Sequence, residues 1–164
     1  CYIYNEYFNV NTNVIRPFNV FGPGMQQNDY RILPNFAHKI KNNEKLLVYG
    51  NGNQTRSYCY ITDAIIGFLR VIIDGKAGET YNIGNPNPEI SVLDLFEVIK
   101  RITDKKIKFE KIQYPKSYPT DEPQRRCPDI TKAVKHIKFN PTTSLEVGLK
   151  KFFTWTETNY VTNY

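Results

Sequence analysis

The chain contains few of the residues that carry metal or redox chemistry. Among its 164 residues are three cysteines, Cys1, Cys59 and Cys127, and two histidines, His38 and His136. The cysteines are odd in number, lie far apart and form no CxxC pair, which excludes a disulfide framework and favours a reducing, cytoplasmic compartment. Because the histidines do not stand at ligand spacing with them, we predict no metal site.

Long apolar runs and a leader-like start are also missing. No stretch reaches the roughly 18 apolar residues that a membrane span needs, and the opening CYIYNEYF lacks a basic segment followed by an apolar one. Residue 1 is Cys, and the helical pattern of residues 2–9 begins without an N-cap residue. We therefore expect a fragment of a longer protein; an artificial or processed terminus is the alternative.

The composition and the pattern of the sequence predict one globular α/β domain over residues 1–164. Hydrophobic residues make up 40% and charged residues 23%, as in ordinary globular chains. Expected helices over 31–41, 64–73, 92–102, 129–137 and 145–156 alternate with short strands, and we expect Thr62–Asp63 and Ser91 to cap two of them. Strands at 14–18 and 79–82 read as fully buried, which is typical of a parallel sheet covered on both faces. The chain does not supply the rest of such a sheet.

A first candidate binding cluster is RPFNVFGPG, residues 16–24. Asn19 ends a strand directly before a Gly-Pro turn, where ligands bind in open α/β sheets. Its amide can donate to a phosphate oxygen. The alternative, that Asn19 only caps the turn, is equally compatible with this pattern.

Two further clusters combine arginine with aromatic or acidic residues. In the segment 46–56, a strand with Tyr49 could hold a flat base, and Arg56 could bind a phosphate bidentately. In the segment 121–129, a carboxylate could bind ribose while an arginine pairs with a diphosphate. A surface hairpin and an internal salt-bridged loop are the alternatives. Asp129 is better explained as a helix cap.

Taken together and in order, these segments resemble the extended short-chain dehydrogenases/reductases that act on nucleotide sugars. The resemblance rests on RPFNVFGPGM (16–25), LLVYGNGNQTRSYCYITDAIIGFL (46–69), ETYNIGNPNPEISVLDL (79–95), EPQRRCPDITKA (122–133) and SLEVGLKKF (144–152). It is strongest for UDP-glucuronate decarboxylase-like proteins and UDP-sugar 4-epimerases. It implies the C-terminal, substrate-binding portion of an extended Rossmann-type fold, whose few strands complete the parallel sheet of an N-terminal half.

The resemblance also implies roles for particular residues. The ligand would be a nucleotide-diphosphate sugar of the UDP or TDP type, and NAD would be bound mainly by the N-terminal half. Tyr60–Asp63 would return the chain to that half. The implied contacts are Phe18 near the nicotinamide, Asn19 on the diphosphate, Arg31 and Ile32 at the start of a helix facing the substrate, Leu47 and Tyr49 flanking the base, Arg56 on phosphate, and Arg126 with Arg125 and Glu122 closing over the ribose and diphosphate.

Two motifs of the family are absent from the chain. No GxGxxG occurs, since Gly50 and Gly52 have no third glycine after them, and no Tyr has Lys four residues on. Both motifs would lie upstream, in the NAD-binding domain that is the expected partner, and the complete enzyme would be a homodimer. The resemblance implies oxidation at sugar C4 to a 4-keto intermediate, and an isolated chain without turnover. Gly24 stands where decarboxylases of the family have Arg, so we expect epimerisation or dehydration rather than decarboxylation.

A different class of function is a basic nucleic-acid-binding module. The net charge of +6 and the 14% of aromatic residues favour it, since aromatics stack on bases. Against it, acidic residues are interspersed with the basic ones and no nucleic-acid motif occurs. A non-catalytic interaction protein is a third reading that the sequence leaves open.

Overall fold

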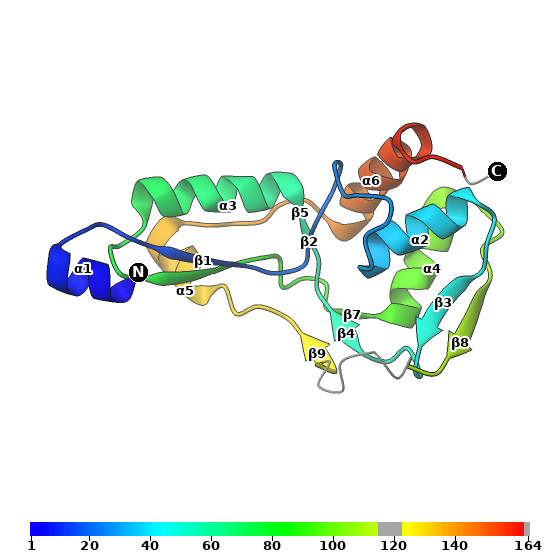
Figure 1. Ribbon diagram of the computed structural model, residues 1–164, viewed down its shortest axis with the longest axis horizontal. Coiled ribbons are helices and arrows are strands. Elements are labelled where there is room, and N and C mark those ends of the chain that lie inside the picture. Colours follow the sequence, from blue (N-terminus) through cyan, green and yellow to red (C-terminus); the bar gives the residue numbers. More distant parts are fainter. Residues whose placement is uncertain (115–122, 163–164) are drawn as a thin grey trace. The chain divides into compact units, whose positions relative to one another are not determined.

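A computed structural model describes residues 1–114 and 123–162 as two compact units. Unit 1 comprises Cys1–Val20, Ser57–Glu89 and Cys127–Leu145, and unit 2 comprises Phe21–Arg56, Ile90–Arg126 and Glu146–Tyr164. Each unit is made of three segments, and the six segments alternate along the chain (Figure 1). The pattern of helices and strands is the α/β pattern that the sequence predicts.

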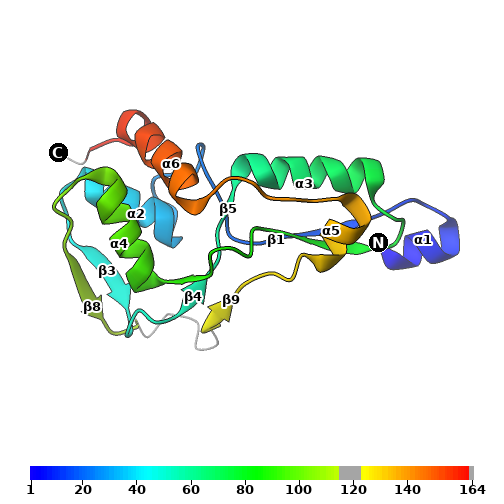
Figure 2. The ribbon, with the colours of Figure 1, turned by 180° about the vertical axis from the view of Figure 1, so that it is seen from behind.

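Unit 1 is built on two parallel strands. Its elements are α1 (Tyr2–Phe8), β1 (Val14–Pro17), β5 (Cys59–Tyr60), α3 (Ile61–Asp74), β6 (Thr80–Ile83) and α5 (Thr131–Ile137). Strand β1 runs parallel to β6 with Val14 opposite Thr80 and Pro17 opposite Ile83. Both α3 and α5 pack against β6, as Figure 2 shows from behind. Their contacts form a core of Val71, Tyr81, Ile83, Ala133, Ile137 and Phe139.

The close approach of α3 to this core depends on a glycine. A Cβ on Gly67 would lie 2.6 Å from Cγ2 of Ile83 and 2.9 Å from Cε2 of Phe139. Both distances are well inside van der Waals contact, so α3 packs this close only with hydrogen at position 67. Glycine in mid-helix otherwise costs about 1 kcal/mol relative to alanine, and the packing offsets that cost.

The prediction that strand 14–18 is fully buried was wrong. Val14 and Ile15 are half-buried, and Arg16 and Pro17 are exposed. In β6, Tyr81 and Ile83 are buried while Thr80 and Asn82 are half-buried. The pair therefore buries one face well and the other only in part, whereas a parallel sheet usually has both faces covered.

Unit 1 also exposes two apolar helical faces. Helix α1 contains no buried residue, and its aromatic side chains are among the most exposed of the chain, with Tyr7 75% and Phe8 66% exposed. On α3, one face buries Ala64, Gly67 and Val71. Its other face leaves a second set of large aliphatic side chains in water: Ile65, Ile66, Leu69, Ile72 and Ile73. Exposed apolar area of this kind marks surfaces that other protein segments cover.

Unit 2 combines two small sheets with three helices. Helix α2 (Ile32–Lys41), helix α4 (Val92–Thr103) and helix α6 (Leu145–Asn159), which starts at the unit boundary, accompany a parallel pair of β3 (Leu46–Tyr49) and β8 (Phe109–Ile112). The second sheet has the order β7-β4-β9, formed by Ile90–Ser91, Thr55–Arg56 and Arg125–Arg126. Strand β2 (Val20–Phe21) spans the unit boundary. The stripe predicted for the last helix is confirmed, since Leu145, Leu149, Phe152 and Thr156 are all buried.

Of the three helix caps that the sequence predicted, only Ser91 stands in the N-cap position; Tyr60 takes it in α3 and Ile130 in α5. Ser91 caps α4, accepting from the backbone N–H of Asp94 at 3.0 Å, and the Asp94 carboxylate completes a capping box. The prediction that Thr62–Asp63 cap α3 was wrong, because the helix begins at Ile61 with Tyr60 in the cap position. Asp63 lies in the first turn and accepts from the Thr143 backbone N–H at 2.9 Å. Asp129 accepts from the Thr131 N–H at 2.8 Å and so supports the start of α5.

Candidate functional site

Two of the predicted binding arginines lie side by side in unit 2. Strand β4 runs parallel to β9, with Thr55 opposite Arg125 and Arg56 opposite Arg126. Partners in a parallel register stand about 4.8 Å apart and project from the same face of the sheet. Segments almost 70 residues apart in the sequence thus bring two guanidinium groups onto one face. Arg56 is half-buried, and its Nη1 donates to the Thr55 carbonyl at 2.8 Å. Arg126 is exposed.

Arg125 belongs to the opposite face of the same sheet. Successive side chains of a strand alternate between faces, so Arg125 shares its face with Thr55 and Ser91 rather than with Arg56 and Arg126. The sequence grouped Arg125 with Arg126, and the register separates the two. Glu122, which completed that group, lies outside the described residues.

An aromatic pair lies at the carboxyl end of the β3–β8 sheet. Tyr49, the last residue of β3, stacks on Tyr114, with ring centroids 5.7 Å apart and an interplanar angle of 21°. The burial of β3 alternates, so Leu47 and Tyr49 are half-buried on one face while Leu46 and Val48 are buried on the other. The amide of Gln54 donates to the Tyr49 carbonyl at 3.3 Å and ties this end of β3 to the approach to β4. The carboxyl ends of parallel strands are where open α/β sheets bind ligands.

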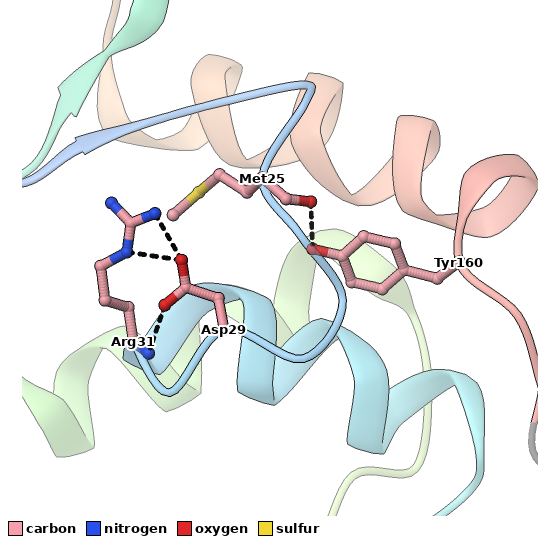
Figure 3. A network of polar contacts seen from close by, with 4 residues as sticks. All are labelled: Met25, Asp29, Arg31 and Tyr160. Carbon is pink, nitrogen blue, oxygen red and sulfur yellow. Dashed lines mark hydrogen bonds and ion pairs between the residues drawn. The ribbon is translucent and has the colours of Figure 1, made fainter.

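The loop before α2 carries an internal ion pair. Arg31 Nε donates to Asp29 Oδ2 at 2.8 Å, and the Arg31 backbone N–H donates to Oδ1 at 2.9 Å (Figure 3). This hydrogen-bonded guanidinium holds the pKa of the Asp29 carboxyl below its ordinary value. Arg31 stands in the cap position of α2 and is exposed, and Ile32 is its half-buried first residue. Asp29 thus already orients the Arg31 side chain, for which a contact with substrate is predicted.

The remaining predicted residues lie at the carboxyl end of β1 in unit 1. Asn19 has a positive φ of 42°, and its Nδ2 donates to the Ser57 carbonyl at 2.8 Å. Its own carbonyl accepts from the Cys59 N–H at 3.2 Å. The Asn19 amide therefore holds the chain segment that follows Arg56, which is a structural contact with Ser57 rather than a cap on the Gly-Pro turn. Phe18 is half-buried and donates its N–H to Ile83, and its Cβ lies 2.9 Å from the position of a Cβ on Gly84.

Sequence reasoning missed several residues around these positions. Tyr114 lies two residues after the end of β8, and nothing in its sequence context indicates a stack on Tyr49. Asp29 could have been found, since Asp side chains often accept from the backbone N–H two residues on, as Asp29 does from Arg31. None of the predicted site residues lines the pocket of about 300 Å³ formed in unit 1 by residues 85–87, 130 and 140–144.

Metal and membrane sites are absent from the described part of the chain. Over residues 1–114 and 123–162, no three His, Cys, Asp or Glu side chains gather as a metal would need. Within the same ranges, no helix combines the length and the apolar character of a membrane span.

The parallel sheets and their flanking helices are those of a portion of a Rossmann-type α/β fold. Residues 1–84, half of the chain, match the model of the NAD dependent epimerase/dehydratase family. The chain belongs to this family, as the sequence resemblance implied.

Relatives and solved structures agree with this assignment. UDP-glucuronic acid decarboxylase 1 of Xenopus tropicalis is 36% identical over 151 residues, which cover 92% of this chain and 34% of that protein. The UDP-N-acetyl-alpha-D-glucosaminuronate decarboxylase of Bacillus cytotoxicus is 32% identical over 87% of this chain and 45% of its own length. The crystal structure of UDP-glucuronic acid 4-epimerase from Bacillus cereus, in complex with UDP-glucuronic acid and NAD, superposes with a TM-score of 0.86 and 28% identity. It covers 98% of this chain and 49% of that one.

The chain therefore spans between a third and a half of the length of these proteins. It shares their fold over nearly all of its own length. For this chain, the activity and the ligands named for the longer proteins are proposals.

Proposed function

We propose that this chain binds the nucleotide diphosphate of a UDP- or TDP-type sugar nucleotide, as the substrate-binding portion of an NAD-dependent epimerase or dehydratase. The observation that carries the proposal is the in-register pair of Arg56 and Arg126 on one face of the β4–β9 sheet. Two guanidinium groups on one face of a sheet can both bind the same anion. Each presents a planar fork that matches phosphate oxygens bidentately.

The aromatic pair at the end of β3 supports a nucleotide rather than a simple phosphate. Tyr49 and Tyr114 present a flat surface in the same unit as the arginine pair, linked to β4 through Gln54. A base can stack or lie edge-on there, with Leu47 beside it. Fixing the base and the diphosphate at two points orients the sugar, and such orientation supplies several kcal/mol of a reaction barrier.

We further propose that a cofactor-binding half covers unit 1, in a complete enzyme that is a cytoplasmic homodimer. The exposed apolar faces of α1 and α3 and the partly covered β1–β6 sheet support this, as does the length of the relatives. NAD would bind mainly to that half, with Phe18 near the nicotinamide. The chain itself has no glycine-rich turn that fits a dinucleotide, so we assign it no step of cofactor chemistry. Its three cysteines are free thiols, which suits a reducing compartment.

The expected outcome of the reaction is epimerisation or dehydration. Gly24 has a φ of +93°, a conformation that side chains with a Cβ rarely adopt. An arginine at this position would need a different loop backbone. Decarboxylation is the alternative, since the Xenopus and Bacillus cytotoxicus relatives are decarboxylases. Release of labelled carbon dioxide from a sugar-carboxylate substrate by the complete enzyme would establish that alternative.

Calorimetric titration of the chain with UDP, UMP and uridine tests the binding proposal. We expect UDP to bind more tightly than UMP, and uridine to bind most weakly, because the arginine pair recognises the diphosphate. Equal affinity for all three would overturn the assignment of Arg56 and Arg126. Salt-sensitive binding of single-stranded RNA that UDP does not displace would favour the nucleic-acid reading instead. No reduction of NAD is expected from the chain alone.

A further inference from the structure

The loop between β2 and α2, residues 22–31, contains neither helix nor strand. Its conformation is therefore set by side-chain and turn contacts rather than by a ladder of backbone bonds. Arg31 stands at the end of this loop, where the Asp29 carboxylate holds its guanidinium. Whatever fixes the loop also fixes the direction in which Arg31 and the start of α2 point.

The C-terminal segment Tyr160–Val161 makes three hydrogen bonds to this loop. The side chain of Gln27 pairs with the Val161 backbone, accepting from its N–H at 2.6 Å and donating to its carbonyl at 2.6 Å. This is the pattern of a β-bridge, with the amide side chain in place of a strand. The Tyr160 hydroxyl donates to the Met25 carbonyl at 3.0 Å, as Figure 3 shows beside the Asp29–Arg31 pair. The partners lie about 135 residues apart in the sequence.

The segment is itself firmly held within unit 2. The side chain of Tyr160 is only 4% exposed, and its ring packs edge-on against Trp155 at the end of α6, with centroids 5.8 Å apart. Lys41, the last residue of α2, donates to the carbonyls of Glu157, at 2.7 Å, and Tyr160. The segment thus joins α6, the end of α2 and the loop before α2. A loop anchored to it cannot shift without breaking several bonds at once.

We propose that Tyr160–Val161 is a strap that positions the loop 22–31 for substrate binding, with Gln27 as the positioning residue on the loop. The strap acts through the loop and does not touch the ligand. The consequence for binding rests on the function proposed above, in which Arg31 and Ile32 face the substrate. The structural part of the proposal, that the strap fixes the loop, does not depend on that function.

Hydrogen–deuterium exchange of the chain tests the structural part. Gln27→Ala removes the pair to Val161 together with the 2.8 Å contact between Gln27 Nε2 and His38 Nδ1. Gln27→Glu keeps the acceptor and loses the donor, and Tyr160→Phe removes the bond to Met25 while both Gln27 contacts stay. Each variant is expected to speed exchange in residues 24–31 by about three- to tenfold, the equivalent of one or two net hydrogen bonds. Asn159→Ala is the matched control, because the Asn159 amide bonds only within the last turn of α6. Unchanged exchange in the loop of Gln27→Ala would overturn the strap.

Calorimetry with UDP, on the same proteins, tests the consequence for binding. We expect Gln27→Ala to weaken UDP by a similar three- to tenfold factor, and Asn159→Ala to leave its affinity unchanged. A looser loop with unaltered UDP affinity would refute the positioning role and leave the nucleotide proposal standing. If the unmodified chain does not bind UDP at all, the proposed function fails. The exchange experiment still shows whether Tyr160–Val161 fixes the loop 22–31.

Discussion

Replacing Arg126 with alanine is expected to weaken UDP binding strongly, and replacing its neighbour Arg125 is expected to change it little. A charge-assisted hydrogen-bond pair to a phosphate contributes about 1.5 to 3 kcal/mol. Arg126 is exposed, so we take the lower part of this range, about 1.5 to 2 kcal/mol. Since 1.4 kcal/mol is a factor of about ten, the expected loss is about 10- to 30-fold.

Arg125 is a suitable control because it lies on the face of the sheet opposite to Arg56 and Arg126. Both carry one positive charge, both are exposed, and both sit on β9. Arg125 projects from the face opposite to Arg56, so it acts on the ligand only through a screened long-range field. At about 0.15 M salt the screening length is about 8 Å, and we expect no more than about a twofold loss.

The measurement is isothermal calorimetry with UDP on the unmodified chain, Arg125→Ala, Arg126→Ala and Arg126→Lys. Lysine keeps the charge but not the planar fork, so an intermediate loss is expected. Thermal unfolding without ligand controls for folding: Arg126 is exposed, so its removal should change the free energy of unfolding by no more than about 0.5 kcal/mol. Equal losses for Arg125→Ala and Arg126→Ala would refute the reasoning, since they would indicate non-specific attraction by net charge.

Four further predictions concern stability and reactivity. Gly67→Ala should lower the free energy of unfolding by about 1 to 2 kcal/mol, because the cost of overpacking the unit 1 core exceeds the gain in helix propensity. A variant that is more stable in urea titration would show that the core accommodates the added methyl group. Ser91→Ala should cost about 1 kcal/mol by removing the capping box, again measured in urea, and an unchanged midpoint would contradict the role of the cap. Burial raises the pKa of Tyr160 and of the Cys59 thiol to about 12 each. Both groups therefore keep their protons to higher pH in the folded protein than in the unfolded chain. Their contribution to the free energy of unfolding is fully present below about pH 9 and is lost as the pH rises towards 12. Tyr160→Phe should make this loss smaller, and an equal loss in the variant and the unmodified chain would exclude the Tyr160 phenol as a cause. At pH 8 a thiol reagent should label exposed Cys1 and leave Cys59 unmodified until the protein is unfolded, and rapid labelling of Cys59 in the folded chain would contradict its burial.

Local patterns in the sequence predicted helix features correctly where those features depend only on contacts between residues close in the sequence. The spacing of Leu145, Leu149, Phe152 and Thr156 predicted the buried stripe of α6, and the Ser91–Asp94 pair predicted the start of α4. These features depend on residues three or four positions apart, whose distance the helix itself sets. Thr62 and Asp63 carried the same kind of capping signal, but Asp63 binds the Thr143 N–H instead. A tertiary partner 80 residues away outweighed the local one.

Strand burial was less predictable because it depends on what covers each face. The apolar character of residues 14–18 suggested a fully buried strand, whereas the described residues bury β1 only in part. The same reason explains the apolar surfaces of α1 and α3, whose side chains are exposed in unit 1. A strand or a helix face is buried only if a second element packs on it.

By itself, the sequence determined the family and the α/β class, and it predicted a set of arginines and aromatics as ligands of a diphosphate and a base, because residue type and order are local and chemical. Only the tertiary structure decided which of these residues lie side by side. The register of β4 with β9 put Arg56 beside Arg126 and turned Arg125 to the other face, and the fold of unit 2 brought the C-terminal segment onto Gln27. Strand register and contacts over more than 100 residues arise from the packing of the whole unit, which no local pattern encodes.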